Sequence, residues 1–225
     1  MPENRPAIRS FVRREGRITQ AQKNALHRHQ NYILVNQADE LGEWFDNQAP
    51  QYLEIGFGQG ENLVHMAQRY PEHKFLGVEV YRPGIGSCLC KLHQQQIHNV
   101  RICQADSVEL LALIADNSLH KILIFFPDPW PKLRHHKRRL IQQTFVSLLS
   151  KKLKPEGILH LATDWENYAE QMLNVLHLFP EFINMTPSGY AERPAYRTLT
   201  RFENRGLRLG HPIRDMLFQK TGVKT

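Results

Sequence analysis

Three glycines at alternate positions follow a short apolar segment, in the sequence Glu54-Ile-Gly56-Phe-Gly58-Gln-Gly60. Glycine allows a tight turn and a close approach of the backbone to a ligand. The spacing differs from the G-x-G-x-x-G fingerprint of dinucleotide-binding proteins, and Glu54 would repel a pyrophosphate but attract a cation. S-adenosylmethionine carries an ammonium and a sulfonium, so the motif favours this methyl donor over NAD. The alternative is a glycine turn that binds no ligand.

Two more acidic side chains follow predicted strands. Glu79 lies 23 residues after Gly56, which is the spacing expected of a carboxylate that accepts hydrogen bonds from both hydroxyls of a ribose. Asp106 ends the next strand and could accept a hydrogen bond from the amino group of adenine. Glu54, Glu79 and Asp106 are therefore candidate cofactor ligands, and the alternative is that they are solvated strand ends.

A proline-rich loop follows the fourth predicted strand, in the sequence Phe126-Pro-Asp128-Pro-Trp130-Pro-Lys132. Its prolines restrict the backbone and hold an acid next to an indole ring. A carboxylate can accept hydrogen bonds from N1–H and the amino group of guanine, and an aromatic face can stack on a base. The loop is thus suited to holding a purine, unless it is merely a rigid turn.

A basic run comes next, and it suits the backbone of a nucleic acid. The alternative is the solvated start of a helix. A metal site at the two adjacent histidines is not favoured, because adjacent side chains diverge and no Cys or acidic ligands accompany them. The candidate RNA-binding residues are Arg134, His135, His136, Lys137, Arg138 and Arg139.

Two further groups of polar residues lie later in the chain. Asp164 follows the fifth predicted strand and precedes Trp165, where it is either a site residue or the N-cap of a helix. The sequence Thr200-Arg201-Phe202-Glu203 brings together hydroxyl, cationic, aromatic and acidic groups, which would mean little in isolation.

The elements that position these residues are short apolar strands alternating with amphipathic segments. This alternation predicts an α/β fold with a doubly wound, mostly parallel sheet and helices on both faces. Residues 198–209 are either a late edge strand or a loop. The predicted strands are 52–55, 75–80, 100–105, 121–126, 158–163 and, more weakly, 182–185, and the predicted helices are 62–70, 85–96, 108–115, 138–153 and 165–179.

Charge distinguishes the two ends of the chain. The 225 residues include 29 Lys and Arg against 22 Asp and Glu, a formal charge of +7. Residues 1–28 hold seven basic and two acidic residues and therefore contribute +5. They form a basic arm, predicted to be flexible, ahead of a single domain over 29–225. This distribution indicates an anionic partner such as a nucleic acid, or else a merely solubilising tail.

Composition excludes several classes of protein. No apolar stretch approaches the ~18 residues of a membrane span, and the first residues lack the apolar core of a signal peptide. The three cysteines form no C-x-x-C pair, so neither a disulfide framework nor a zinc site is expected. We therefore expect a cytoplasmic protein without a metal or membrane partner.

The chain closely resembles the bacterial tRNA (guanine-N7)-methyltransferases from about residue 8 to 220. The proline-rich loop with its basic sequel is the most specific part of the resemblance, whereas the glycine motif identifies only the wider class I methyltransferases. The matching motifs, in order, are Glu54-x-Gly-x-Gly-x-Gly60, Phe126-Pro-Asp-Pro-Trp-Pro-Lys132, Arg134-His-x-Lys-Arg-Arg139, Ala162-Thr-Asp-Trp165 and Thr200-Arg-Phe-Glu203.

The resemblance implies a Rossmann-like class I fold and an enzyme that transfers a methyl group from S-adenosylmethionine to N7 of guanine 46 in the tRNA variable loop. It assigns cofactor binding to Glu54, Glu79, Asp106 and Asp128, and RNA contacts to residues 134–139. The substrate residues that it implies are Lys132, Asp164, Thr200, Arg201, Phe202 and Glu203.

This chemistry agrees with the residues present. N7 of guanine has a free lone pair and no proton to lose, so its attack on a methyl group needs alignment more than a general base. Asp128 is the candidate catalytic residue, with Asp164 as a second candidate, because a carboxylate stabilises the positive charge that develops on the base.

Two other functions compete with this one. An amino-group methyltransferase acting on adenine or cytosine would use a similar Asp-Pro-aromatic motif, but Lys132 and the basic run distinguish the present loop. A non-catalytic RNA-binding subunit of the same fold would be expected to have lost its cofactor acids, and all of them are present. The sequence is compatible with a monomer or a homodimer.

Overall fold

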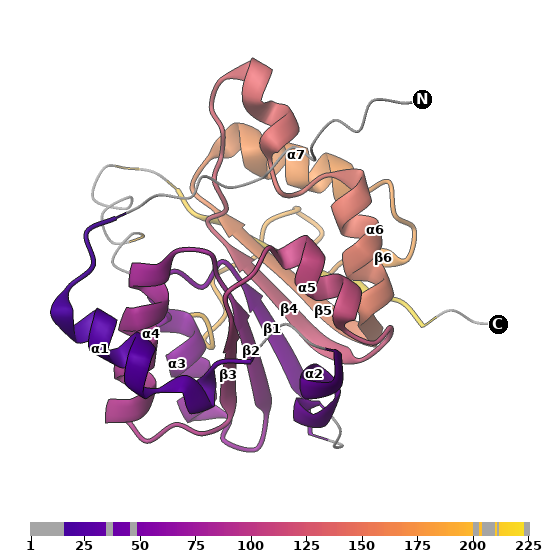
Figure 1. Cartoon of the computed structure of the whole chain (residues 1–225). Helices are drawn as coiled ribbons and strands as arrows, with labels where there is room; N and C mark the ends of the chain where they lie inside the picture. The colour runs from indigo at the N-terminus through magenta and orange to yellow at the C-terminus, as the bar shows by residue number, and fades with distance from the viewer. Residues whose placement is uncertain are drawn as a thin grey trace, which may run out of the picture.

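One seven-stranded sheet forms the centre of the computed structural model, with the strand order β3-β2-β1-β4-β5-β7-β6 (Figure 1). The structure describes residues 16–34, 38–45, 49–199, 203, 210 and 212–222. The strands are β1 (Gln51–Ile55), β2 (Lys74–Val78), β3 (Val100–Cys103), β4 (Leu119–Phe125), β5 (Leu153–Thr163), β6 (Phe182–Asn184) and β7 (Arg214–Lys220).

The first five strands are parallel, and β7 is antiparallel to both of its neighbours. All six predicted strands are present, but β7 was not predicted. Its flanks, Arg214-Asp215 and Gln219-Lys220, are charged or polar, which conceals a strand whose middle packs in the core at Met216 and Phe218. Thr198 and Leu199 do not form the late strand considered for residues 198–209, and most of that range lies outside the described residues.

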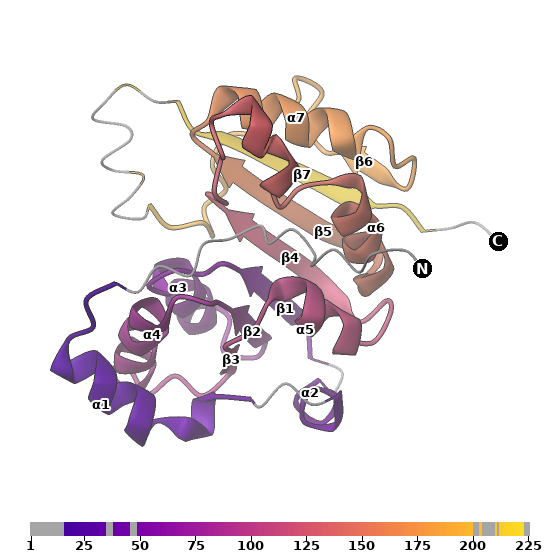
Figure 2. The same ribbon diagram turned by 45° about the horizontal axis from the view of Figure 1, so that its top comes forward.

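Helices cover both faces of the sheet, as predicted (Figure 2). Buried side chains of α2, α5, α6 and α7 contribute to the core on one face, and those of α1, α3 and α4 to the core on the other. The bounds are α1 (Gln20–Arg28), α2 (Ala38–Trp44), α3 (Glu61–Arg69), α4 (Arg82–Gln94), α5 (Ser107–Leu113), α6 (Gln143–Lys152) and α7 (Glu166–Leu176), with two 3-10 helices, η1 (Gln30–Tyr32) and η2 (Leu133–Arg138).

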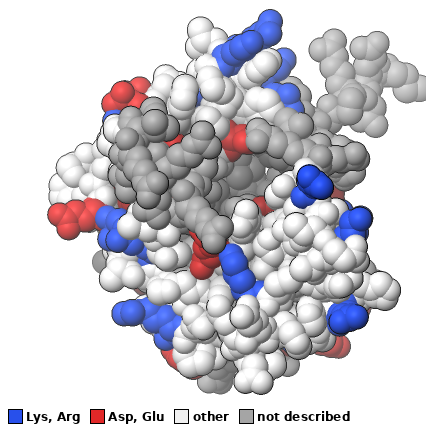
Figure 3. Space-filling view, turned by 90° about the vertical axis from the view of Figure 1, so that its left-hand side faces the viewer, with Lys and Arg blue, Asp and Glu red and all other residues white. Residues whose placement is uncertain are grey.

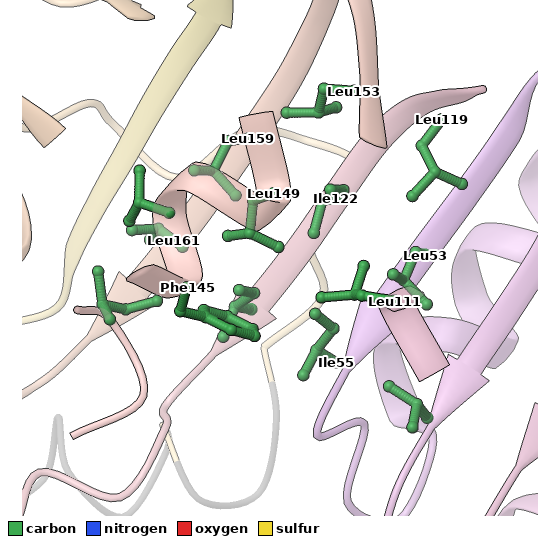
Figure 4. Packing of buried hydrophobic residues seen from close by; sticks show 14 of the residues in the cluster. Leu53, Ile55, Leu111, Leu119, Ile122, Phe145, Leu149, Leu153, Leu159 and Leu161 are labelled. Atoms are coloured by element: carbon green, nitrogen blue, oxygen red, sulfur yellow. The ribbon is translucent and has the colours of Figure 1, made fainter. Parts of the chain in front are cut away.

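The core on the α6 side is built from aliphatic side chains of the central strands. Leu53 of β1 and Ile122 of β4 are neighbours in register, and Leu149 of α6 lies over this part of the sheet (Figure 4). The side chains are fully buried. Because β1, β4 and β5 are covered on both faces, they can present functional groups only at their ends.

The predicted arm, residues 1–28, contains a helix in its second half. Thr19 caps α1 with a reciprocal capping box to Gln22. Ala25 and Leu26 are buried, and Gln22 packs against Gly86 of α4, where any Cβ would lie 2.8 Å from the Cβ of Gln22. Residues 20–28 therefore differ from the expected flexible arm, because an apolar face and a cap anchor them. Residues 1–15 lie outside the described residues.

The long helix predicted over 138–153 is shorter in the structure. Residues 133–138 form η2, and α6 begins only at Gln143. No residue of η2 is buried, whereas the buried side chains that anchor α6 begin at Phe145. The segment from Asp128 to η2 consequently projects from the body at the top of Figure 1.

In the part of the chain that the structure describes, no helix has the length and apolar character needed to cross a membrane.

Candidate functional site

The carboxyl ends of the parallel strands meet at one edge of the sheet, which we call the site edge. Glu54, Glu79, Asp106, Asp128 and Asp164 lie within or just beyond the last residues of β1 to β5. Strand β7 begins at this edge, because Arg214 pairs with Thr163 at the end of β5. In open α/β sheets, ligands bind at this edge.

The glycine turn after β1 has the predicted geometry. Gly56, Gly58 and Gly60 have φ angles of 73°, 57° and 73°, in the left-handed region that favours glycine. Apart from each glycine and its neighbours in the chain, no heavy atom of the described residues lies within 4 Å of the position that a Cβ would take on Gly56 or Gly58. Gly56 and Gly58 thus face open space, where a ligand can approach them, whereas Gly60 packs against Cys88 of α4.

Glu79 holds the glycine turn in place. Its carboxylate accepts hydrogen bonds from the backbone N–H groups of Gly58 (2.8 Å), Val80 (2.7 Å) and Tyr81 (3.0 Å). Burial raises its pKa against these hydrogen bonds, and the negative charge of Asp128 adds to the rise. Two oxygens offer about four acceptor sites, so the carboxylate keeps acceptor capacity for a ligand.

Glu54 is the most strongly perturbed acid at the site edge. It is buried and accepts a hydrogen bond from the side-chain amide of Asn62 at 2.9 Å. Burial raises its pKa to about 8, the amide of Asn62 opposes the rise, and the charge of Glu79 adds to it. A cationic ligand would favour the ionised form of this carboxyl. Electrostatic repulsion thus links Glu54 to Glu79 and Glu79 to Asp128.

Asp106 has a structural role that the sequence did not predict. Its carboxylate caps α5 by accepting the N–H of Val108 at 2.9 Å. The cap fixes the side chain at the end of β3 and leaves one carboxylate oxygen for another partner.

The loop after β4 holds Asp128 on a strained backbone. Phe126 and Trp130 have φ angles of 52° and 44°, which are unfavourable for residues other than glycine. Such strain is often found at functional sites, where the surrounding structure maintains it. Between these two residues, Asp128 is exposed, so its carboxylate is accessible to a substrate.

Two residues of the basic run support the proline-rich loop. The guanidinium of Arg138 lies 3.7 Å from the centre of the Trp130 ring, and the ring of His135 meets Trp130 edge-on at 5.9 Å. One face of the predicted stacking surface is therefore covered by a cation. Lys132, Arg134 and Lys137 are exposed, and they are the members of this region most accessible to RNA.

The structure contradicts the prediction that Arg139 contacts RNA. Its residue is 2% exposed, and its guanidinium donates to the carbonyl of Pro129 at 2.8 Å and to Asn167 of α7 at 2.9 Å. It also donates to Gln171 and lies over the ring of Tyr168. Arg139 ties the proline-rich loop to α7, and a charge pattern cannot distinguish such a residue from its exposed neighbours.

Asp164 is half-buried and does not cap α7. The helix begins after Trp165 without a side-chain cap, and the N–H of Trp165 donates to the hydroxyl of Thr163. The N-cap alternative is therefore wrong, and Asp164 remains a candidate for substrate binding. Trp165 is 38% exposed beside it.

The last predicted motif is described only at Glu203. Thr200, Arg201 and Phe202 lie outside the described residues. Glu203 is buried and hydrogen-bonded to Arg197, so it lies inside the protein in this structure, and its contact with the substrate stays a prediction. Arg197 was not predicted as its partner, because a single arginine in a loop carries no recognisable pattern.

Other buried polar residues at the site edge were also missed, among them Asn62, His160 and Asp215. Asn62 follows the glycine turn by two positions and could have been suspected as a neighbour of Glu54. Asp215 belongs to the strand that was not predicted. Among the described residues there is no group of three or more His, Cys, Asp or Glu that could hold a metal ion.

Acidic groups lie at a hollow on one face of the molecule. Figure 3 shows acidic atoms at a hollow near the middle of the face it presents, with Lys and Arg side chains around it. Such an arrangement would suit a cationic ligand inside the hollow and an anionic partner around it.

Comparison with known proteins gives consistent results. Residues 48–216 match a family described as "Putative methyltransferase". A tRNA (guanine-N7)-methyltransferase of Paraburkholderia xenovorans is 50% identical over 98% of this chain and 86% of its own length. One from Vibrio cholerae is 48% identical over 95% and 92%.

Solved structures show the fold. A 16S rRNA (adenine(1408)-N1)-methyltransferase of Catenulisporales acidiphilia, solved with its cosubstrate S-adenosylmethionine, has a TM-score of 0.56. It is 13% identical over 84% of this chain and 93% of its own length. This similarity confirms the predicted Rossmann-like class I methyltransferase fold.

Proposed function

The chain belongs to the tRNA (guanine-N7)-methyltransferases, and we propose that it methylates N7 of guanine 46 in the variable loop of tRNA, with S-adenosylmethionine as the methyl donor. The observation that carries this proposal is the site edge itself. A strained loop presents Asp128 within electrostatic reach of Glu79, which holds a glycine turn that is open at Gly56 and Gly58.

The residues present fit S-adenosylmethionine. The open space above Gly56 and Gly58 allows a ligand to approach the backbone, and the buried carboxyl of Glu54 is complementary to a cation. Glu79, with its remaining acceptor sites, would bind the ribose hydroxyls, and the free oxygen of Asp106 would bind the adenine amino group. When bound, S-adenosylmethionine supplies an electrophilic methyl group on a sulfonium.

The chain's own residues would act mainly by positioning. N7 of guanine needs no base to become a nucleophile, so the geometry in which it is held determines the rate. Asp128, and with it Asp164, would orient the guanine and stabilise the positive charge that develops on its ring. The rigid prolines and the link from Arg139 to Pro129 keep the Asp128 loop from collapsing.

The RNA backbone would be bound by the exposed cations of the projecting segment. Lys132, Arg134 and Lys137 are exposed beside the Asp128 loop, where they can neutralise phosphates while the base enters the site. Arg138 supports Trp130 in the absence of RNA.

A cytoplasmic location and a monomeric or homodimeric state remain part of the proposal. The three cysteines are free thiols, as is usual in a reducing compartment.

The test is to incubate the protein with labelled S-adenosylmethionine and an unmodified tRNA transcript, and to identify the labelled nucleoside. We expect 7-methylguanosine, and no label in a matched transcript in which adenine replaces guanine 46. If the second transcript is labelled at another guanine, the assignment to position 46 is wrong. Methylated adenosine or cytidine would support the amino-group reaction, and tight tRNA binding without transfer would support a non-catalytic subunit.

A further inference from the structure

Arg197 is a buried cation at the site edge, and the reaction proposed above assigns it no role. The residue is 1% exposed. Its Nε and Nη2 donate to the two carboxylate oxygens of Asp215 at 2.6 and 2.8 Å, and its Nη1 donates to Glu203. One guanidinium thus holds two carboxylates, and the bidentate pair fixes its orientation.

The carboxylate of Asp215 is itself held by β5. His160 contacts Asp215 at 2.7 Å through Nε2 and the hydroxyl of Tyr196 at 2.9 Å through Nδ1. Burial lowers the pKa of His160, so the neutral ring donates to Asp215 and accepts from Tyr196. Burial opposes the ionisation of Asp215, but hydrogen bonds from His160 and Arg197 outweigh it and lower its pKa. Asp215 is therefore a fixed anion.

Arg197 also contacts the base of the loop that carries Asp128. Its guanidinium carbon lies 5.5 Å from the centre of the Phe125 ring and 5.8 Å from that of Phe126. Phe126 is one of the two strained residues of this loop. The cation is thus placed between the start of the Asp128 loop and the sheet strand β7 that begins at Arg214.

The residue after Arg197 is tied to the cofactor half of the site. The N–H of Thr198 donates to the side-chain oxygen of Asn62 at 3.3 Å, and the amide nitrogen of Asn62 donates to Glu54 at 2.9 Å. Asn62 is buried. Arg197 therefore contacts the start of the loop after β4, and the adjacent Thr198 is linked through Asn62 to Glu54.

From these contacts we propose that Arg197 is a positioning residue for methyl transfer, which fixes the Asp128 loop and the segment leading to Thr200 relative to each other. Asn62 holds the same segment against Glu54. The inference rests on the proposed function, since it assumes that Asp128 contacts the guanine. It predicts that a small change at Arg197 alters the rate of transfer more than the binding of either substrate.

The main test is Arg197→Lys, which keeps the charge but loses the bidentate fork. Because a displacement of about 1 Å can cost about 100-fold in rate, we expect kcat for tRNA methylation to fall roughly 10- to 100-fold. The Kd values for S-adenosylmethionine and tRNA, measured by titration calorimetry and filter binding, should change less than about threefold. An unchanged kcat would overturn the proposal.

Lys220→Met is the matched control for lost stability. Lys220 is a buried cation at the other end of β7, where it donates to the carbonyls of Ser150 and Leu153. We expect this variant to lose thermal stability comparably and to keep the wild-type kcat below its melting temperature. If kcat falls as far as in Arg197→Lys, stability alone explains the loss and the proposal fails.

Glu203→Gln provides a milder variant if Arg197→Lys does not fold. Both variants weaken the same contact, so the double variant should lose no more than about threefold beyond Arg197→Lys alone. Fully additive losses would contradict a shared role. The wild-type protein in the same assay separates the two proposals: if it does not methylate guanine, the proposed function fails, whereas wild-type transfer with an unaffected Arg197→Lys variant refutes only the positioning role.

Discussion

Charged groups are buried both at the site edge and at the opposite edge, where the parallel strands begin. The two groups differ in the partners that surround them. At the edge opposite the site, Lys152 donates to the carbonyl of Ile114 and to Asp116, and Lys220 donates to two carbonyls and to Asn117. Two of these carbonyls, at Ser150 and Leu153, lie at the end of α6, where a helix leaves backbone acceptors without partners. Each cation there completes the local structure.

At the site edge, by contrast, burial disfavours the ionised form of two acids. Burial raises the pKa of Glu54 to about 8, and acidic neighbours add to the perturbation of Glu54 and Glu79. Phe126 and Trp130 adopt unfavourable backbone angles. None of this stabilises the fold. Acids with raised pKa values and a strained backbone therefore mark the functional edge, whereas buried charge alone does not.

The largest difference between the two edges is expected when one exposed acid is removed from each. Asp128→Ala should lower kcat by about 100-fold or more, as expected for a group that stabilises developing charge, while the melting temperature stays unchanged because Asp128 is exposed. Asp116→Ala, the control, removes an exposed carboxylate that pairs with Lys152 and should leave kcat unchanged. Equal activity of the two variants would remove Asp128 from the mechanism.

The second prediction concerns the buried acid of the site edge. Glu54→Gln should weaken the binding of S-adenosylmethionine roughly 10-fold or more, because a charge-assisted contact is lost. In the wild-type protein, affinity should rise with pH up to about 8, because a bound cation favours the ionised carboxyl. Calorimetry at several pH values tests this, and a pH profile shared by wild type and variant would contradict it.

The same acid makes a prediction for stability without ligand. Its pKa is higher in the folded protein than the ordinary 4.5, so its contribution to stability falls as pH rises from about 4.5 to about 8. Glu54→Gln should remove this part of the pH dependence. Thermal melts of the two proteins at pH 5 and pH 9 are the measurement, and a larger advantage of the variant at pH 5 would be the wrong sign.

At the opposite edge, the expected effect is on stability alone. Lys220→Met leaves two buried carbonyls and the exposed side chain of Asn117 without their donor, which should lower the free energy of unfolding by roughly 2 kcal/mol. Denaturant titration measures this loss. A variant as stable as the wild type would show that water or neighbouring donors replace the ammonium.

The smallest predicted effect concerns the exposed cations beside the site. Replacing Arg134 and Lys137 together with alanine should weaken tRNA binding and reduce the slope of log Kd against log salt by about 1.5, for two phosphates. The matched control, Lys151→Ala with Lys154→Ala, alters cations near the opposite end of β5 and should leave the slope unchanged. A wild-type slope in the first variant would exclude these two residues from phosphate binding.

The sequence predicted most of the fold because its signals are local. Apolar strands, the glycine turn and the position of each acid after a strand follow from short patterns around residues such as Gly56 and Asp128. Strand β7 was not predicted, because it is stabilised by pairing with β5 and β6, which are distant in the sequence, and its polar ends have no strand character of their own. Local pattern alone could not show that Arg139 is buried, since that depends on α7 folding against the loop.

The site residues divide in the same way. Side chains whose role follows from a motif, such as Glu79 and Asp128, were identified, whereas those that hold the motifs in place were not. Asn62, Arg197 and Asp215 act through contacts across large sequence separations, and no spacing rule connects them.

The position of β7 between β5 and β6 affects how the protein is made. Of all the strands, β7 leaves the ribosome last, yet it is the partner through which β6 joins the sheet. Until it is inserted, the edge of β5 stays open to pairing with other chains, and Arg197 lacks the carboxylate of Asp215. A nascent chain that has already folded its glycine turn therefore still lacks the carboxylate that orients Arg197, and this buried ion pair can form only after β7 has been synthesised.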